Sequence, residues 1–183
     1  MDGRGVGLAA WAARVVRPVR RLWIPYLLGV HEPDIAYVAL GSNLGDRAAH
    51  LGRARVALAA LRASRILVES EIEETAPIGP AGQGPYLNQM VALETTLAPL
   101  SLLDALHDIE RAAGRVRAER WGPRTLDLDI VSFGGRPMTD PRLTIPHPEL
   151  PRRDFWRREV AELDARLAER ASAERASGEV APP

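Results

Sequence analysis

Two carboxylates in residues 125–131 are spaced to act together. The segment reads Thr-Leu-Asp-Leu-Asp-Ile-Val, so apolar residues alternate with Asp127 and Asp129. Because side chains alternate between the two faces of a strand, both aspartates point to one side and the apolar residues to the core. Neighbouring carboxylates repel, which raises the pKa of one, and a hard cation such as Mg²⁺ relieves the repulsion. Taken alone, the pair favours an ordinary solvated strand face.

The loop before this strand supplies the opposite charge. Residues 114–124 contain four arginines, namely Arg115, Arg117, Arg120 and Arg124. A basic loop is usually just solvated, but one beside an acidic pair indicates a clamp for a polyphosphate. A metal ion bridges phosphate oxygens, and guanidinium groups neutralise the charge that develops on them.

The composition narrows the chemistry that this cluster can perform. The chain has 183 residues, a formal net charge of zero and 46% apolar residues. These values are typical of a folded globular domain, and they exclude a global basic field for nucleic acid. The absence of cysteine excludes disulfides and thiolate metal sites. The absence of lysine excludes a P-loop and a Schiff-base nucleophile, and leaves arginine, whose planar fork suits phosphate oxygens.

The same data suggest where the protein acts. No apolar run approaches the ~20 residues of a membrane-spanning helix. We expect a cytoplasmic monomer that binds neither nucleic acid nor membranes. Residues 1–34 are basic and are interrupted by Pro18 and Pro25, so we interpret them as an extension outside the domain.

Aromatic and amide side chains near the loops suggest a site for a flat ring. Trp121 lies in the arginine-rich loop, where its exposure is costly unless it stacks on a flat partner. Tyr86 and Asn88 follow the proline- and glycine-rich loop 76–85 and offer stacking and hydrogen bonds to a ring edge. Spacing alone leaves ordinary core packing equally open.

Two histidines are weaker candidates. His107 and Glu110 are three residues apart on an expected helix and share one face, which is also typical of a solvated helix. His147 stands between two prolines that keep the chain extended, and it is either a phosphate donor or a surface residue.

Apolar periodicity and turn residues predict the elements that position these groups. Strands are expected at 35–40, 65–75, 86–97 and 125–133, and helices at 47–62 and from about 102 to 114. One covered face of the second strand is indicated by Ile66, Val68, Ser70 and Ile72. A surface helix is expected after Phe155, from the spacing of Val160, Leu163 and Leu167.

The element order predicts the fold. Strand, helix, strand, strand, helix, strand is the ferredoxin-like, split βαβ order. We therefore expect an α+β protein, with helices packed on an antiparallel sheet and an additional C-terminal helix. The expected divisions are an extension (1–34), the catalytic domain (35–155) and a helical segment with a tail (156–183).

Four motifs carry a resemblance over residues 35 to about 155. They are Val-Ala-Leu-Gly-Ser-Asn-Leu-Gly (38–45), Tyr-Leu-Asn (86–88), Arg-Trp-Gly-Pro-Arg-Thr-Leu-Asp-Leu-Asp-Ile (120–130) and Ile-Pro-His-Pro (145–148). In order and spacing they resemble the signatures of the 6-hydroxymethyl-7,8-dihydropterin pyrophosphokinase family. The resemblance implies transfer of diphosphate from ATP to the pterin hydroxymethyl group, with release of AMP, in folate biosynthesis.

The resemblance also implies roles for individual residues. It implies that Asp127 and Asp129 bind two Mg²⁺ ions and that Arg115 and Arg124 join them in catalysis. The implied ATP-binding residues are His107, Glu110, Arg115, Arg117, Trp121, Arg124, Arg142, Thr144, His147 and Arg153. The implied pterin-binding residues are Gly41, Thr75, Ile78, Tyr86, Asn88, Trp121, Asp127 and Phe155.

The sequence departs from the family after Phe155. The family continues there with a strand and a Pro-Leu-x-Glu-Ile-Ala-Pro-like segment, whereas this chain continues with Trp156 and a charged stretch. One alternative is therefore a binding protein that has lost catalysis. Another is a metal-dependent transferase of a different class, which would explain the aspartate pair but not the other motifs.

Overall fold

The structure, a computed structural model, describes residues 32–77, 82–115 and 122–177. The elements are β1 (Asp34–Ser42), α3 (Arg47–Ala59), β2 (Ser64–Glu69), β3 (Glu73–Thr75), β4 (Tyr86–Thr95), α4 (Pro99–Ala112), β5 (Asp127–Phe133), β6 (Met138–Asp140), β7 (Leu143–Ile145), a 3-10 helix (Leu150–Arg152) and α5 (Asp154–Ala176). Almost all of the expected N-terminal extension, residues 1–31, lies outside the described residues.

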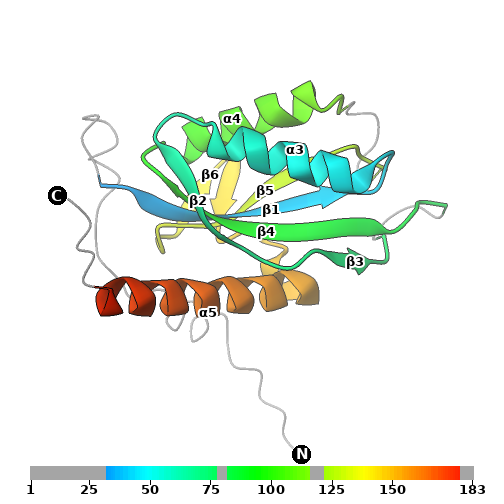
Figure 1. Cartoon of the computed structure of the whole chain (residues 1–183). Helices are drawn as coiled ribbons and strands as arrows, with labels where there is room; N and C mark the ends of the chain where they lie inside the picture. Colours follow the sequence, from blue (N-terminus) through cyan, green and yellow to red (C-terminus); the bar gives the residue numbers. More distant parts are fainter. Residues whose placement is uncertain (1–31, 78–81, 116–121, 178–183) are drawn as a thin grey trace, which may run out of the picture.

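An antiparallel sheet forms the centre of the molecule. Its strands run in the order β2-β4-β1-β5, and β3 extends the edge by pairing with β4. Figure 1 shows α3 and α4 on one face of this sheet and α5 on the other. This confirms the predicted α+β fold with the split βαβ strand order and a C-terminal helix.

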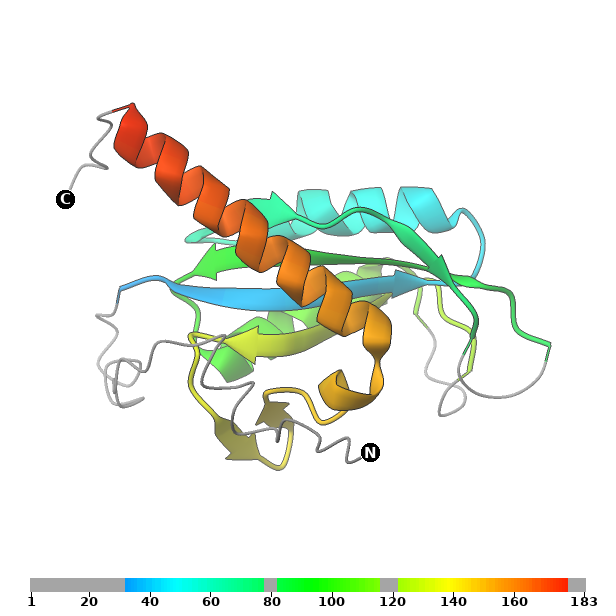
Figure 2. The same cartoon turned by 90° about the horizontal axis from the view of Figure 1, so that it is seen from below.

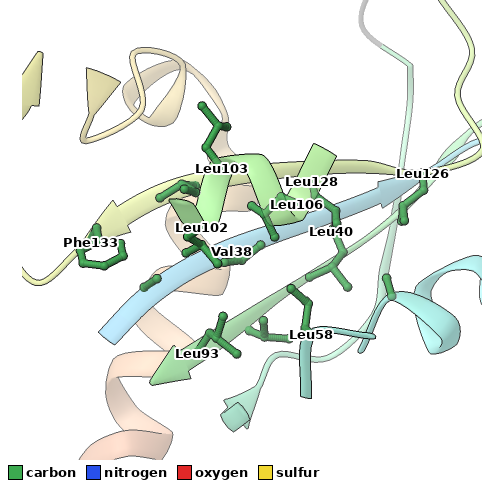
Figure 3. Close-up of a cluster of buried hydrophobic side chains, with 14 of the residues drawn as sticks. Val38, Leu40, Leu58, Leu93, Leu102, Leu103, Leu106, Leu126, Leu128 and Phe133 are labelled. Atoms are coloured by element: carbon green, nitrogen blue, oxygen red, sulfur yellow. The ribbon is translucent and has the colours of Figure 1, made fainter. Parts of the chain in front are cut away.

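The face under α3 and α4 is closed by aliphatic side chains. Alternate residues of the central strands, including Val38, Leu40 and Leu128, meet Leu58 of α3 and Leu106 of α4. Figure 3 shows these side chains converging between the sheet and the helices. Burial of this apolar surface is the main source of stability, at roughly 25 cal/mol per Å².

The opposite face is covered by α5, which crosses the strands obliquely (Figure 2). Trp156, Val160 and Leu163 pack there against Tyr37 and Met90 of the sheet. The predicted C-terminal helix is thus confirmed: its apolar residues Val160 and Leu163 face the sheet, and its later turns are mostly exposed. None of the helices in the described ranges is both long and apolar enough to cross a membrane.

The second predicted strand is broken into two, and its faces were predicted wrongly. The pairing with β4 shifts between Ile66 and Val68, so that Ile66 packs under α3 and α4 while Val68 packs under α5. A second interruption follows at Ser70, whose Oγ accepts a hydrogen bond from the backbone N of Met90 (2.9 Å). The bulge between Ile66 and Val68 turns the strand over locally, and the break after Glu69 ends it, so the simple alternation is lost.

Candidate active site

A pocket lies where β1 ends and α5 begins, on the α5 face of the sheet. It is lined by Ala39, Leu40, Gly41, Thr75, Ala76, Tyr86, Asn88, Arg124, Asp127, Asp129, Arg153, Phe155 and Trp156. Most of these residues were predicted as site residues from the sequence. The structure therefore brings together groups from four strands, two loops and the start of a helix.

The aspartate pair has the predicted orientation. Leu126, Leu128 and Ile130 are buried in the core under α3 and α4, whereas Asp127 and Asp129 line the pocket on the opposite face. Burial, together with the charge of Asp127, raises the pKa of Asp129 to about 7. The predicted repulsion between the two carboxylates is thus present.

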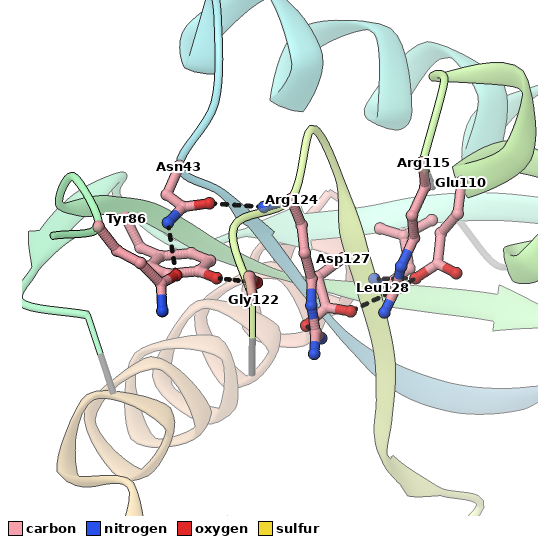
Figure 4. Close-up of polar contacts among 9 residues, drawn as sticks. Asn43, Tyr86, Glu110, Arg115, Gly122, Arg124, Asp127 and Leu128 are labelled. Atoms are coloured by element: carbon pink, nitrogen blue, oxygen red, sulfur yellow. Dashed lines mark hydrogen bonds and ion pairs between the residues drawn. The ribbon is translucent and has the colours of Figure 1, made fainter. Parts of the chain in front are cut away.

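Asp127 connects the two arginines that flank the strand. Its Oδ1 lies 2.7 Å from Nη1 of Arg115, and its Oδ2 lies 2.6 Å from Nη1 of Arg124. Both guanidinium groups are mostly shielded from water, so each ion pair is stronger than one on the open surface. Figure 4 shows Arg115 and Arg124 reaching Asp127 from different segments of the chain.

A second hollow borders this pair on the side of α4. It is lined by His107, Glu110, Arg111 and Arg115. Glu110 is buried and forms an ion pair with Arg115, and it also accepts a hydrogen bond from the backbone N of Leu128 (2.8 Å). Glu110 thereby fixes both the start of β5 and one arginine. Because Arg115 also pairs with Asp127, one guanidinium group links the two hollows.

Asn43 holds the loops around the pocket, a role that the sequence analysis missed. Its backbone N donates to the carbonyl O of Arg124 (3.1 Å), and its Oδ1 accepts from the backbone N of Arg124 (2.7 Å). Its Nδ2 donates to Oε1 of Gln83 (3.1 Å). The side chain is buried, and Figure 4 shows it beside Arg124. The only hint was its place in the Gly-Ser-Asn-Leu-Gly turn.

The inner wall of the pocket is suited to the edge of a flat ring. Nδ2 of Asn88 donates to Oγ1 of Thr75 (2.7 Å), which fixes the amide plane and leaves its oxygen available to a ligand. Tyr86 donates to the carbonyl O of Gly122 (3.4 Å). A Cβ at Gly41 would lie 3.5 Å from Oδ1 of Asn88, so glycine keeps this wall open.

Three side chains from the end of β7 to the start of α5 pack together at the other end. The guanidinium carbon of Arg153 lies 4.2 Å from the centre of the Trp156 ring. The rings of His147 and Trp156 meet edge to face, with centres 5.0 Å apart. Burial lowers the pKa of His147, and the charge of Arg153 adds to this effect. His147 is therefore neutral at pH 7.

Of the predicted residues that the structure describes, His147, Arg142 and Thr144 do not line these hollows. Arg142 pairs with Asp104 of α4, and Thr144 is exposed on β7. Ile78, Arg117 and Trp121 fall outside the described residues.

The donor set suits a hard divalent cation. Asp127 and Asp129 offer only oxygen ligands, and the pKa of Asp129 is raised first by burial and then by the charge of Asp127, which a cation would offset. No cluster of three or more acidic or histidine side chains that could hold a metal occurs within the described ranges. Any ion there needs water or substrate oxygens to complete its shell, as is usual for Mg²⁺.

Comparison with known proteins gives a consistent answer. Over 135 residues the chain is 46% identical to the 2-amino-4-hydroxy-6-hydroxymethyldihydropteridine pyrophosphokinase of Pseudomonas aeruginosa, which covers 73% of this chain and 83% of that protein. The proteins of the same name are 50% identical over 112 residues in Pseudomonas putida (61% of this chain, 92% of that protein) and 42% identical over 130 residues in Bacillus subtilis (71% and 78%). A family profile described as 7,8-dihydro-6-hydroxymethylpterin-pyrophosphokinase matches residues 37–165. The chain therefore belongs to the 7,8-dihydro-6-hydroxymethylpterin-pyrophosphokinase family.

Proposed function

We propose that the protein transfers diphosphate from ATP to the hydroxymethyl group of 6-hydroxymethyl-7,8-dihydropterin in folate biosynthesis. The observation that carries the proposal is the convergence of Asp127, Asp129 and two arginines on a pocket that also contains Asn88 and Tyr86. This places phosphate-binding chemistry next to a wall suited to a flat heterocycle. Family membership supports the same reaction. A cytoplasmic, monomeric enzyme remains our expectation.

The two hollows suggest how the substrates are divided. The pterin occupies the pocket on the α5 face, where Asn88, Thr75 and Phe155 contact its edge and face. The nucleotide approaches from the hollow beside α4, which His107, Glu110 and Arg115 line. Asp127 lies between them, so the hydroxymethyl oxygen and the β-phosphorus meet beside its carboxylate.

The reaction requires alignment and charge neutralisation more than covalent catalysis. A bond forms between the hydroxymethyl oxygen and the β-phosphorus, and the bond from that phosphorus to the oxygen bridging the α-phosphate breaks. AMP leaves with that oxygen, and the proton of the hydroxyl group is released to water. Arg115 and Arg124 exchange Asp127 for phosphate oxygens and neutralise the developing charge. Asp127 and Asp129 would hold Mg²⁺, which would supply further charge neutralisation when bound, as the family resemblance implies.

The direct test is AMP formation from ATP and Mg²⁺, with and without 6-hydroxymethyl-7,8-dihydropterin. Pterin-dependent AMP, together with a diphosphorylated pterin product identified by mass spectrometry, is the expected result. AMP release that ignores the pterin, or none from a sample that circular dichroism shows to be folded, would refute the proposed function. In the latter case, calorimetric binding of the pterin would favour the alternative of a binding protein.

A further inference from the structure

Trp156 stands between two groups that the sequence analysis assigned to ATP. The guanidinium group of Arg153 lies over its ring at 4.2 Å, and the His147 ring meets it edge to face at 5.0 Å. We infer that Trp156 is a positioning residue that holds Arg153 and His147 in place for the ATP phosphates. The inference rests on the proposed function, and it assigns a role to the first residue at which the chain departs from its family motif.

The tryptophan itself is rigidly held. Its side chain is 2% exposed and belongs to the apolar cluster that α5 forms with Tyr37, Met90 and Val131. A large aromatic ring fixed by packing has a defined orientation, so it can act as a template for more flexible neighbours.

Arg153 needs such a template. An arginine side chain is flexible, and a guanidinium group already stacked on an indole ring loses less conformational freedom when it binds a ligand. Arg153 immediately precedes α5 and is three residues from Trp156, which puts the two on the same side of the helix start. Arg153 lines the pocket together with Asp127 and Asp129, so the stacked guanidinium group already lies where the phosphates are proposed to meet the pterin.

His147 is held from three directions. Its backbone N donates to the carbonyl O of Val131 (2.9 Å), which ties it to β5. Its Nδ1 accepts from the backbone N of Glu149 (3.1 Å), so the proton of the neutral ring is on Nε2. The Trp156 ring then sets the ring plane. The result is a fixed Nε2–H donor, which is a suitable partner for a phosphate oxygen.

The test compares two substitutions of one residue with a substitution elsewhere in the core. Trp156→Phe keeps an aromatic face, whereas Trp156→Leu removes it and keeps an apolar side chain. Phe133→Leu is the control, because Phe133 is fully buried in the cluster under α3 and α4, away from both groups. All three variants lose packing, so a general loss of stability affects them alike.

Steady-state kinetics provides the first readout. We expect Trp156→Leu to raise the KM for ATP about tenfold while changing the KM for the pterin less than threefold. Trp156→Phe should restore most of the ATP affinity, and Phe133→Leu should leave both KM values near wild type. Equal rises in both KM values would overturn the inference, because Trp156 would then be merely a wall of the pocket. Wild-type ATP affinity in Trp156→Leu would overturn it too.

Nuclear magnetic resonance provides a readout that needs no turnover. The ring current of Trp156 should shift the side-chain protons of Arg153 upfield, and this shift should disappear in Trp156→Leu but not in Phe133→Leu. If the wild type makes no AMP, the proposed function fails, and calorimetric titration with MgATP then decides the inference. Weaker binding by Trp156→Leu than by Phe133→Leu supports it. Equal binding, or no binding by the wild type, overturns it.

Discussion

The two faces of the sheet differ in the side chains that are buried on them. Under α3 and α4, the contacts are almost entirely aliphatic, with Leu51, Leu58, Leu102 and Leu106 fully buried. Under α5, the core also includes polar and ionisable groups, such as Tyr37, whose hydroxyl donates to Asp164 (2.5 Å), and the buried Glu159. The pocket that contains Asp127 and Asp129 opens on this second face.

The difference indicates a division of labour. An apolar layer gains free energy from every contact, whereas buried polar groups cost free energy unless they find partners. The α5 face includes such polar groups. At the start of α5, Arg153 and Phe155 line the pocket, so this part of the face is shaped by ligand contact as well as by packing. We therefore expect changes in the aliphatic layer under α3 and α4 to alter stability, and changes of the polar groups on the α5 face to alter function or pH dependence.

The largest expected effect comes from Asp127 on the functional face. In Asp127→Asn the charge that holds Arg115 and Arg124 disappears, together with one of two predicted metal-binding carboxylates. Pterin-dependent AMP formation should fall on the order of a thousandfold, or about 4 kcal/mol at 1.36 kcal/mol per tenfold change. The control is Glu94→Gln, which removes an ion pair with Arg65 between β4 and β2 and lines neither hollow. Activity within tenfold of wild type would disprove the assigned role.

The second effect tests the structural face. Leu106 is fully buried between α4 and the sheet, so Leu106→Ala should lower the free energy of unfolding by about 3 kcal/mol. The KM values of the fraction that stays folded should not change, because no wall of either hollow is formed by Leu106. Val56→Ala, at a site 71% exposed, should cost less than about 0.5 kcal/mol. Chemical denaturation would measure both. Equal decreases in the free energy of unfolding for the two variants would contradict the assignment of Leu106 to the core.

The smallest effect concerns Glu159, the buried acid of α5. Neither of its carboxylate oxygens has a hydrogen-bond partner among the described residues. Burial raises its pKa from 4.5 to about 8, with further contributions from Glu73 and Glu162 that the charge of Arg158 partly offsets. Between those values the folded state retains a proton that the unfolded state has released. Stability must therefore fall as pH rises from about 4.5 to 8 and then level off.

Glu159→Gln removes this titration. Relative to the variant, the wild type should lose on the order of 1–3 kcal/mol across that interval, which denaturation curves at several pH values would resolve. Glu174→Gln is the control, because Glu174 lies on the exposed end of the same helix and pairs with Arg170. Parallel curves for wild type and Glu159→Gln would show that Glu159 ionises as readily in the folded protein as in the unfolded chain.

Much of the first face could be predicted from the sequence, because local periodicity determines it. The alternation of leucine and aspartate in 125–131 assigned Asp127 and Asp129 to the pocket face without any knowledge of the fold. The helix that ends near Gly114 was predicted from apolar spacing and a glycine, and Gly114 indeed has a positive φ of 75° after α4.

Parts of the α5 face were harder to predict because they do not depend on apolar periodicity. Val160, Leu163 and Leu167 do form an apolar stripe on α5, but apolar spacing does not predict that Glu159 is buried beside them. The break between β2 and β3 at Ser70 carries a side-chain hydrogen bond to Met90, twenty residues away. Asn43 likewise acts through contacts with Gln83 and Arg124, which only the fold brings close.

The position of α5 has a consequence for how ligands influence the whole molecule. Its first turn lines the pocket through Phe155 and Trp156, and its next turns cover one side of the sheet through Val160 and Leu163. Detachment of α5 from the sheet must therefore break the wall of the pocket. A ligand that binds only when α5 is packed on the sheet raises the free energy of detachment by RT ln(1 + [L]/Kd). Backbone amides along α5 should then exchange hydrogen for deuterium more slowly in the presence of ligand, even at residues far from it. Ligand binding at the site is in this way coupled to the stability of the whole of α5 against the sheet.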